Sequence, residues 1–193
     1  KQRGKLRQLD MITQLVPEGV SISYVRQAAP KGLGDAILCA RHLVGEEPFA
    51  VLLADDVIRS TRPCVAQLIE VYQRTSGSVL AVEAVPVEKT SSYGIVSLDS
   101  QRRVSSIVEK PAPQLAPSNL GVIGRYLLTP RIFDFLAGLQ PGAGGEIQLT
   151  DAIAELLLVE TVTASAFEGQ RYDCGSQAGW LQATLDYALL RPE

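Results

Sequence analysis

Residues 49–74 read FAVLLADDVIRSTRPCVAQLIEVYQR and contain the clearest change from strand to helix in the chain. The apolar run over 49–53 is typical of a strand buried in a sheet. Two acids, Asp55 and Asp56, follow it. Pro63 suits the first turn of a helix over 62–74, where apolar residues recur at i, i+3, i+4 and i+7. A buried strand followed by an amphipathic helix predicts an α/β unit.

The same alternation extends in both directions. Apolar patterns predict strands over 20–25, 78–85, 95–98, 104–108, 120–128, 162–167 and 171–173. Helical periodicity predicts helices over 33–44, 130–139, 147–157 and 177–190, the last with Ser176 as its cap and a buried face from Trp180 to Leu189. Strands alternate with helices early and hairpins appear late, and no linker is visible. We therefore expect one domain, residues 1–193, with an α/β three-layer architecture around a mixed sheet.

Length and composition exclude several classes of protein. The chain has 193 residues, of which 46% are hydrophobic and 20% charged, which suits a globular domain and excludes a disordered or collagen-like chain. The net charge of −3 argues against a nucleic acid or an anionic membrane as partner. No apolar run is long enough to span a bilayer. Cys39, Cys64 and Cys174 lack paired spacing, so we expect reduced thiols and a cytoplasmic location.

Acidic side chains stand at the ends of two expected strands. Asp55 follows the strand over 49–53, and Asp173 ends the strand over 171–173. In open α/β sheets, ligands bind beyond the carboxyl ends of strands. Carboxylates there can hold Mg²⁺, which also takes oxygens from substrate phosphates and water. Asp is also common in turns, so a metal site and an ordinary turn both remain open at this point.

Three other motifs each have two interpretations. Residues 31–34, Lys-Gly-Leu-Gly, open a helix whose free N–H groups and glycines such as Gly32 would let a ligand approach; the alternative is a plain turn. Tyr93 and Gly94 suit either a ring-shaped ligand or a turn. Glu109 could accept bonds from sugar hydroxyls while Lys110 neutralises a phosphate, or the two could form an exposed ion pair.

Nucleophilic and zinc chemistry are not expected. His42 is the only histidine and lies on the helix expected over 33–44. A Cys-His pair with Cys174, a Ser-His-Asp triad and a zinc site are therefore all disfavoured.

Together and in this order, the motifs resemble the bacterial UTP–glucose-1-phosphate uridylyltransferases of the sugar-nucleotidyltransferase superfamily. The run VSISYVRQ ends at Gln27, and it is followed by KGLG (31–34), LLADD (52–56), EKP (109–111), APSNL (116–120), GRY (124–126), PGAGGEIQLTD (141–151) and YDCG (172–175). The resemblance covers essentially the whole chain. The PGAGGEIQLTDAI and APSNL runs are its most specific parts.

The resemblance implies a Rossmann-like α/β/α nucleotidyltransferase fold and transfer of UMP from UTP to glucose 1-phosphate, which gives UDP-glucose and pyrophosphate. By resemblance, Gln27 and Gly32 match positions that read the uracil, and Asp55 and Asp173 match the carboxylates that hold Mg²⁺. The glucose 1-phosphate pocket corresponds to Tyr93, Gly94, Glu109 and Lys110, with Glu146 close to it. Asp55 and Lys110 would then be the catalytic residues, through the metal and the phosphate respectively. Related enzymes are commonly dimers or tetramers, so the resemblance also implies a homo-oligomer.

The chain departs from the family pattern in three places. Ala54 stands where the family usually has Pro, and Asp35 stands where it usually has His. The family's N-terminal Gly-rich signature, which cradles the nucleotide phosphates, would precede Lys1. We therefore expect an N-terminally incomplete fold without the phosphate-loop segment, and an impaired activity of this chain.

Three alternatives to uridylyl transfer stay open on the residues. One is a thymidylyl- or adenylyltransferase that acts on glucose 1-phosphate. Another is a non-catalytic fragment that binds a sugar nucleotide. A glycosyltransferase that uses Asp55 and Asp56 as its metal motif is the third.

Overall fold

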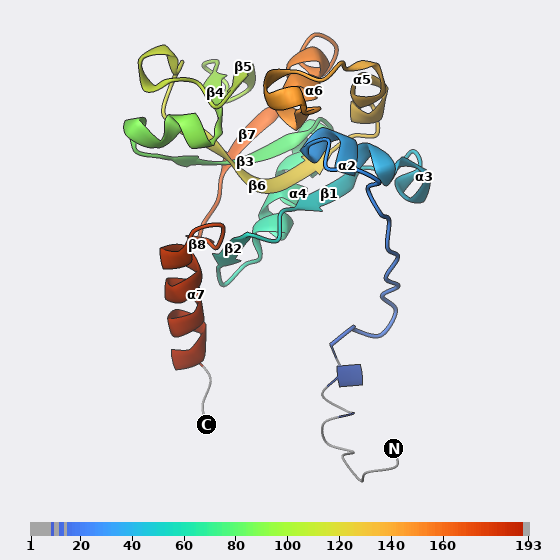
Figure 1. Ribbon diagram of the computed structural model, residues 1–193, viewed down its shortest axis with the longest axis vertical. Helices are drawn as coiled ribbons and strands as arrows, with labels where there is room; N and C mark the ends of the chain where they lie inside the picture. The colour runs from blue at the N-terminus through green and yellow to red at the C-terminus, as the bar shows by residue number, and fades with distance from the viewer. Residues whose placement is uncertain (1–8, 10–11, 14, 191–193) are drawn as a thin grey trace.

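The computed structural model describes residues 9, 12, 13 and 15–190 (Figure 1). Its helices are α2 (Leu33–Cys39), α3 (Arg41–Val44), α4 (Cys64–Thr75), α5 (Ile132–Gly138), α6 (Leu149–Leu156) and α7 (Gln177–Leu189). Short 3₁₀ turns are η1 (Val87–Ser92), η2 (Pro113–Leu115) and η3 (Ala143–Gly145). Its strands are β1 (Phe49–Leu52), β2 (Asp56–Arg59), β3 (Val79–Ala84), β4 (Gly94–Leu98), β5 (Val104–Glu109), β6 (Leu120–Leu128), β7 (Thr163–Ala166) and β8 (Gln170–Asp173).

Strand β6 is the centre of the main sheet. It pairs with β3 along residues 120–127, with β4 at Gly121 and with β1 over residues 125–128. The strand order is β5-β4-β6-β3-β7, with β1 on β6 as well. Only the β3–β7 pair is parallel among these pairings of the described residues. The expected mixed sheet is therefore confirmed.

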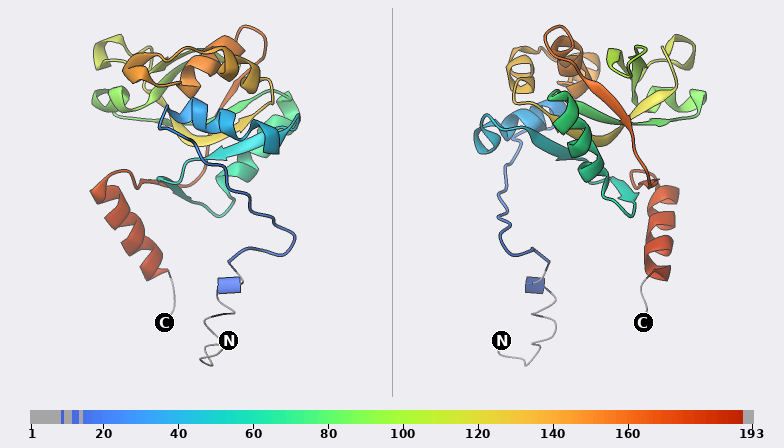
Figure 2. Two further views of the ribbon diagram at one scale, coloured as in Figure 1. Left: turned by 45° about the vertical axis from the view of Figure 1, so that its right-hand side comes forward. Right: turned by 180° about the vertical axis from the view of Figure 1, so that it is seen from behind.

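Helices cover both faces of this sheet, as Figure 2 shows. Alternate residues of a strand point to opposite faces. One face packs on α2, α5 and α6, and its core includes Leu80, Val82, Val122, Leu128, Ile37, Phe133 and Ile153. The other face packs on α4 through Val79, Ala81, Ile123, Leu127, Cys64 and Leu68. This arrangement confirms the predicted α/β/α layers.

A second, two-stranded ribbon of β2 and β8 lies below the main sheet and leads into α7 (Figure 1). Ser176 caps α7 as predicted, because its Oγ accepts a hydrogen bond from the Gly179 N–H at 3.1 Å. The predicted buried face of α7 is wrong. Trp180 is 59% exposed and Leu189 84%, and Ala183 is the only buried residue of this helix. The periodic pattern marked an apolar face that the described residues leave uncovered.

Two other expectations need correction. The strand predicted over 20–25 is absent, because no described strand pairs with this segment, and its Tyr24 is 91% exposed. The run over 49–53 does form β1, but β1 pairs only with β6 among the described strands and so has an unpaired edge. Its residues alternate between half-buried and exposed, and Leu52 is 55% exposed. The helix predicted over 33–44 is divided at Ala40 into α2 and α3.

No helix among the described residues combines the length and the apolar character that crossing a membrane would need.

Candidate functional site

A cleft of about 340 Å³ opens where the ribbon of β2 and β8 meets the main sheet. Its floor includes Val122, Gly124 and Tyr126 of β6. All of the site residues expected from the sequence line this cleft except Gln27 and Gly32, and these are Asp55, Tyr93, Gly94, Glu109, Lys110, Glu146 and Asp173. The fold therefore brings together residues from the turn before β2, the start of β4, the ends of β5 and β8 and the loop before α6.

Asp55 and Asp173 lie side by side because the ribbon pairs their strands. Asp56 is directly opposite Asp173 in the β2–β8 register, and the Cys174 N–H donates a 2.7 Å hydrogen bond to the Asp55 carbonyl. A Cβ atom placed on Gly175 would lie 3.2 Å from Asp173 Oδ1 and 3.5 Å from Asp55 Oδ2. Both carboxylates thus point at the same small volume, and both are exposed.

This pair fits a hard divalent cation. The donors are carboxylate oxygens, and Mg²⁺ typically uses one or two protein carboxylates and completes its shell with water and phosphate oxygens. Within the part of the chain that the structure describes, no three His, Cys, Asp or Glu side chains are arranged to hold a metal. A cation here would therefore take the rest of its ligands from water or from a bound phosphate.

Asp56 has a different environment from Asp55. Its carboxylate is buried, receives the Gly124 N–H at 2.7 Å and forms an ion pair with the Arg171 guanidinium. Arg125 fixes the same turn from the backbone side, since it donates to the carbonyls of Leu53 and Asp56. The two neighbouring acids therefore have different roles: Asp56 stabilises the turn, and the exposed Asp55 carboxylate is available to a ligand.

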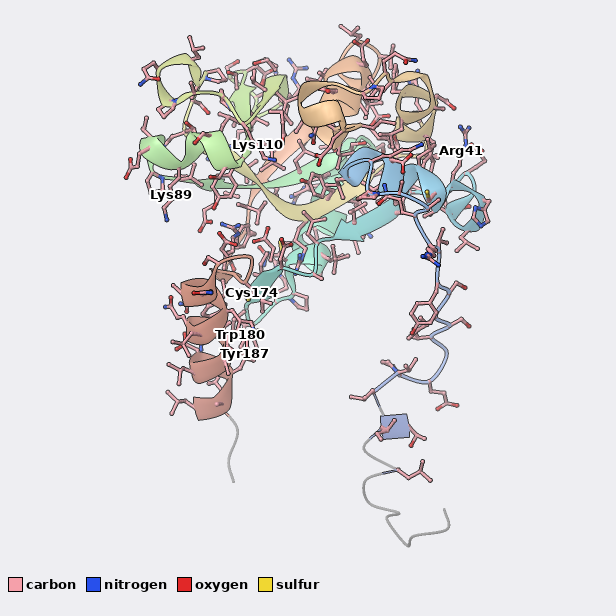
Figure 3. The ribbon with its side chains drawn as sticks, in the orientation of Figure 1. Arg41, Lys89, Lys110, Cys174, Trp180 and Tyr187 are labelled. Atoms are coloured by element: carbon pink, nitrogen blue, oxygen red, sulfur yellow. The ribbon has the colours of Figure 1, made fainter. Side chains whose placement is uncertain are left out.

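The opposite wall of the cleft carries Tyr93, Gly94, Glu109 and Lys110. Lys110 takes a left-handed φ of 44°, its N–H donates to the Tyr93 carbonyl at 2.9 Å, and its Nζ lies 3.4 Å from Glu109 Oε1. Glu109 Oε2 also accepts a 2.9 Å hydrogen bond from Thr150 Oγ1. Lys110 is 54% exposed on its side chain, so its ammonium is accessible to a ligand in the cleft. Figure 3 shows it between β4 and α6.

Gln27 and Gly32 lie beside the cleft and contact each other. The Gln27 amide donates to the Gly32 carbonyl at 3.2 Å and to the Asp35 carboxylate at 2.6 Å. Gly32 has a φ of 98°, and a Cβ there would lie 2.7 Å from the Ile147 carbonyl oxygen, so only glycine fits this position. Asp35, one of the departures from the family pattern, thus holds the amide that the resemblance assigns to uracil.

The cleft is acidic overall. Its lining holds five carboxylates, namely Asp55, Asp56, Glu109, Glu146 and Asp173, against two cations, Lys110 and Arg171. Burial raises the pKa of the neighbouring Tyr126 hydroxyl, and the charges of Glu109, Asp56 and Asp55 raise it further. A phosphate ligand would need added positive charge here, which agrees with a divalent cation at the exposed acid pair.

Arg171 and Thr150 also line the cleft, although neither was predicted from the sequence. Arg171 is almost fully buried, with 10% of its side chain exposed, and it bonds Asp56 and the Tyr93 hydroxyl. One signal pointed to it: Arg171 and Asp173 are two residues apart on a strand and so share a face. Thr150 had no comparable signal, because its contact with Glu109 joins distant parts of the chain.

Comparison with known proteins agrees with this geometry. A family model described as nucleotidyl transferase matches residues 2–188. The UTP–glucose-1-phosphate uridylyltransferase of Bacillus subtilis (strain 168) is 46% identical over 193 residues, covering 98% of this chain and 66% of the relative. That of Staphylococcus epidermidis (strain ATCC 35984) is 46% identical over 197 residues, covering 100% of this chain and 68% of the relative. The chain thus spans about two thirds of the length of the curated relatives it matches.

Solved structures give the same result. A UDP-glucose pyrophosphorylase in complex with UDP-glucose aligns with a TM-score of 0.89 and 41% identity, over 97% of this chain and 73% of the other. A UTP-bound UGPase from Acinetobacter baumannii aligns with a TM-score of 0.87 and 42% identity, over 100% and 68%. The chain is therefore a member of the nucleotidyl transferase family, and the two curated relatives named above are bacterial UTP–glucose-1-phosphate uridylyltransferases.

Proposed function

We propose that this protein transfers UMP from UTP to glucose 1-phosphate, giving UDP-glucose and pyrophosphate. One observation carries the proposal: a single cleft holds the exposed pair Asp55 and Asp173 opposite Glu109 and Lys110. The first pair suits a cation on phosphate oxygens, and the second suits a phosphorylated sugar. The names of the relatives supply the nucleotide and the sugar.

In this proposal each side chain binds or orients a part of the substrates. Lys110 neutralises the phosphate of the sugar as a point charge, and Glu109 accepts hydrogen bonds from sugar hydroxyls. Thr150 donates to Glu109 and so fixes the direction of its carboxylate. Gly94 lets Thr150 pack closely against the start of β4, where Thr150 reaches Glu109, and Glu146 lines the same cleft.

No protein nucleophile is needed for this reaction. An oxygen of the sugar phosphate attacks the α-phosphorus of UTP in line, and pyrophosphate leaves with the electrons of the broken P–O bond. Catalysis then consists of positioning and charge neutralisation. Mg²⁺, held by Asp55 and Asp173, would supply positive charge to the phosphate oxygens. The chain contributes the two carboxylates, the ammonium of Lys110 and the shape of the cleft.

Gln27 and Gly32 are proposed to read the uracil from the edge of the cleft. The Gln27 amide must then exchange its bond to Asp35 for one to the base. The cost of this exchange predicts weaker nucleotide binding than a chain without Asp35 would have.

A pyrophosphate-release assay tests the proposed reaction. We expect release that requires UTP, glucose 1-phosphate and a divalent cation together, with Mg²⁺ sufficient. UTP should be preferred over dTTP and ATP, which separates this activity from thymidylyl or adenylyl transfer. Release that does not depend on glucose 1-phosphate, a preference for dTTP or ATP, or no release at all would contradict the proposal.

Location and assembly follow from the same proposal. We propose a cytoplasmic enzyme, in keeping with the free thiols of Cys39, Cys64 and Cys174. We also propose self-association into a dimer or tetramer, which the exposed apolar residues of α7 support, Trp180 and Leu189 among them. Light scattering of the purified protein measures the assembly, and a monomer at all concentrations would contradict it.

A further inference from the structure

Arg171 joins the two walls of the cleft through one side chain. Its Nε forms an ion pair with Asp56 Oδ1, and its Nη1 donates a 3.1 Å hydrogen bond to the Tyr93 hydroxyl. The guanidinium also lies over the Tyr93 ring, 5.2 Å from its centroid, and 3.8 Å from Glu83 Oε2. Asp56 belongs to the ribbon and Tyr93 directly precedes β4 of the main sheet. Arg171 therefore connects the wall that carries the aspartates to the opposite wall of the cleft.

The bond to Tyr93 fixes the direction in which the tyrosine can donate. Arginine has donors and no acceptor, so the Tyr93 oxygen must accept from Nη1. The single hydrogen of the hydroxyl is then left for a different acceptor. Since Tyr93 lines the cleft, that hydrogen is available to an oxygen of a ligand bound there. The adjacent positive charge also makes the hydroxyl a stronger donor.

The ion pair with Asp56 fixes the position of the neighbouring aspartates. Asp56 is next to Asp55 in the chain and opposite Asp173 in the ribbon, so its position sets that of both exposed carboxylates. An arginine guanidinium is always charged in proteins, so it keeps its ion pair with Asp56 and its hydrogen bond to Tyr93.

We infer that Arg171 is a positioning residue for the sugar phosphate. It makes the Tyr93 hydroxyl a hydrogen-bond donor to the glucosyl phosphate part of the ligand. It also fixes the position of that donor relative to Asp55 and Asp173. The inference rests on the proposed function. Lysine cannot replace Arg171, because an ammonium is one point charge and cannot occupy the separate positions of Nε and Nη1 at the same time.

The test is a double-mutant cycle of Arg171→Lys and Tyr93→Phe, measured by calorimetric titration with UDP-glucose and with UDP in the presence of Mg²⁺. The lysine keeps a positive charge beside buried Asp56, and phenylalanine keeps the ring. Arg41→Lys is the matched control, since Arg41 also lies over an aromatic ring, Phe133 at 5.8 Å, and pairs with a carboxylate, Asp134 at 2.9 Å, but is outside the cleft (Figure 3).

We expect each cleft variant to raise the Kd for UDP-glucose about tenfold, the cost of one charge-assisted hydrogen bond, and the Kd for UDP less than about twofold. The double variant should bind UDP-glucose no more weakly than Tyr93→Phe alone, because Arg171 acts through Tyr93. Arg41→Lys should bind as the unchanged chain does. Circular dichroism checks folding. If Arg171→Lys does not fold, a variant that carries both Asp56→Asn and Arg171→Gln, and so has no charge at either position, replaces it in the cycle.

Additive losses, or equal losses for UDP and UDP-glucose, would overturn the inference while leaving the proposed function in place. Failure of the unchanged chain to bind UDP-glucose would overturn both.

Discussion

Asp56 of β2 and Asp173 of β8 are directly opposed residues of an antiparallel ribbon, although they come from opposite halves of the chain. This pairing brings Asp55, the neighbour of Asp56, to Asp173, and the Cys174 N–H bond to the Asp55 carbonyl completes the contact. Two strand ends that look unrelated in the sequence thus become one exposed pair of carboxylates. The proposed cation site depends on this pairing more than on any single residue.

Asp173→Asn should weaken the response to Mg²⁺. The change removes one of two negative charges and leaves the size of the side chain unchanged, so the concentration of Mg²⁺ needed for half-maximal pyrophosphate release should rise by about tenfold or more. Asp134→Asn is the control, because Asp134 is an exposed carboxylate outside the cleft, and it should leave the Mg²⁺ response unchanged. An unchanged response in Asp173→Asn would remove this residue from the cation site.

Lys110→Met should weaken binding of the sugar phosphate. Loss of a charged hydrogen bond to phosphate costs about 1.5–3 kcal/mol, which is about 10–100-fold in the KM or Kd for glucose 1-phosphate. Lys89→Met is a suitable control, since Lys89 is an exposed lysine on η1 that points away from the cleft (Figure 3). Equal effects of the two substitutions would show that general charge, and not the position of Lys110, determines binding.

Gly94→Ala should disturb the wall of the cleft that carries Glu109 and Lys110. A Cβ there would lie 2.7 Å from Thr150 Cγ2 and 3.5 Å from Glu109 Oε2. Relief of this overlap requires the Thr150–Glu109 pair to shift, at a cost of about 1–3 kcal/mol in the free energy of unfolding. Binding of UDP-glucose should weaken as well. Gly138→Ala has open space around its Cβ and should leave both thermal unfolding and binding nearly unchanged; equal effects at the two positions would contradict the packing argument.

Cys64 should make the protein less stable at high pH. Burial raises the pKa of its thiol, with the charge of Arg125 opposing this in part. The unfolded chain therefore loses this proton near pH 8.5, while the folded chain keeps it to a higher pH. The stabilisation is present below about pH 8.5 and declines as pH rises toward the folded-state pKa, by at most about 1.4 kcal/mol per pH unit.

Thermal unfolding at pH 7.5 and pH 10 measures this effect. Cys64→Ala should be less stable than the unchanged chain at pH 7.5 because a cavity forms. Its further loss at pH 10 should be smaller, because the titrating thiol is gone. Parallel losses in the two proteins would contradict the role of Cys64.

Most of the secondary structure could be predicted from local pattern. The strand over 120–128 and the hairpin of β4 and β5 follow the prediction closely, because each is a short run rich in apolar residues that turn residues bound. Burial was harder to predict. The apolar faces of 20–25 and of α7 are visible in the sequence, yet whether another element covers them depends on contacts that no local pattern contains.

The grouping of candidate residues was predictable where side chains follow the ends of strands. Asp55, Asp173, Glu109 and Lys110 were proposed for this reason, and they lie in one cleft. The different roles of Asp55 and Asp56 were not predictable, because they depend on Arg171 and Gly124, whose contacts with Asp56 span distant parts of the chain. The sequence shows that an acid is present, and the tertiary contacts decide which acid is free.

The central claim is that Asp55 and Asp173 hold a cation on the phosphates of a uridine sugar nucleotide. Calorimetric titration of the unchanged chain with UDP-glucose, once with Mg²⁺ and once with EDTA, tests it most directly. We predict binding that is at least about tenfold tighter with Mg²⁺, and loss of this difference in Asp173→Asn. Equal binding with Mg²⁺ and with EDTA, or no binding in either, would contradict the claim.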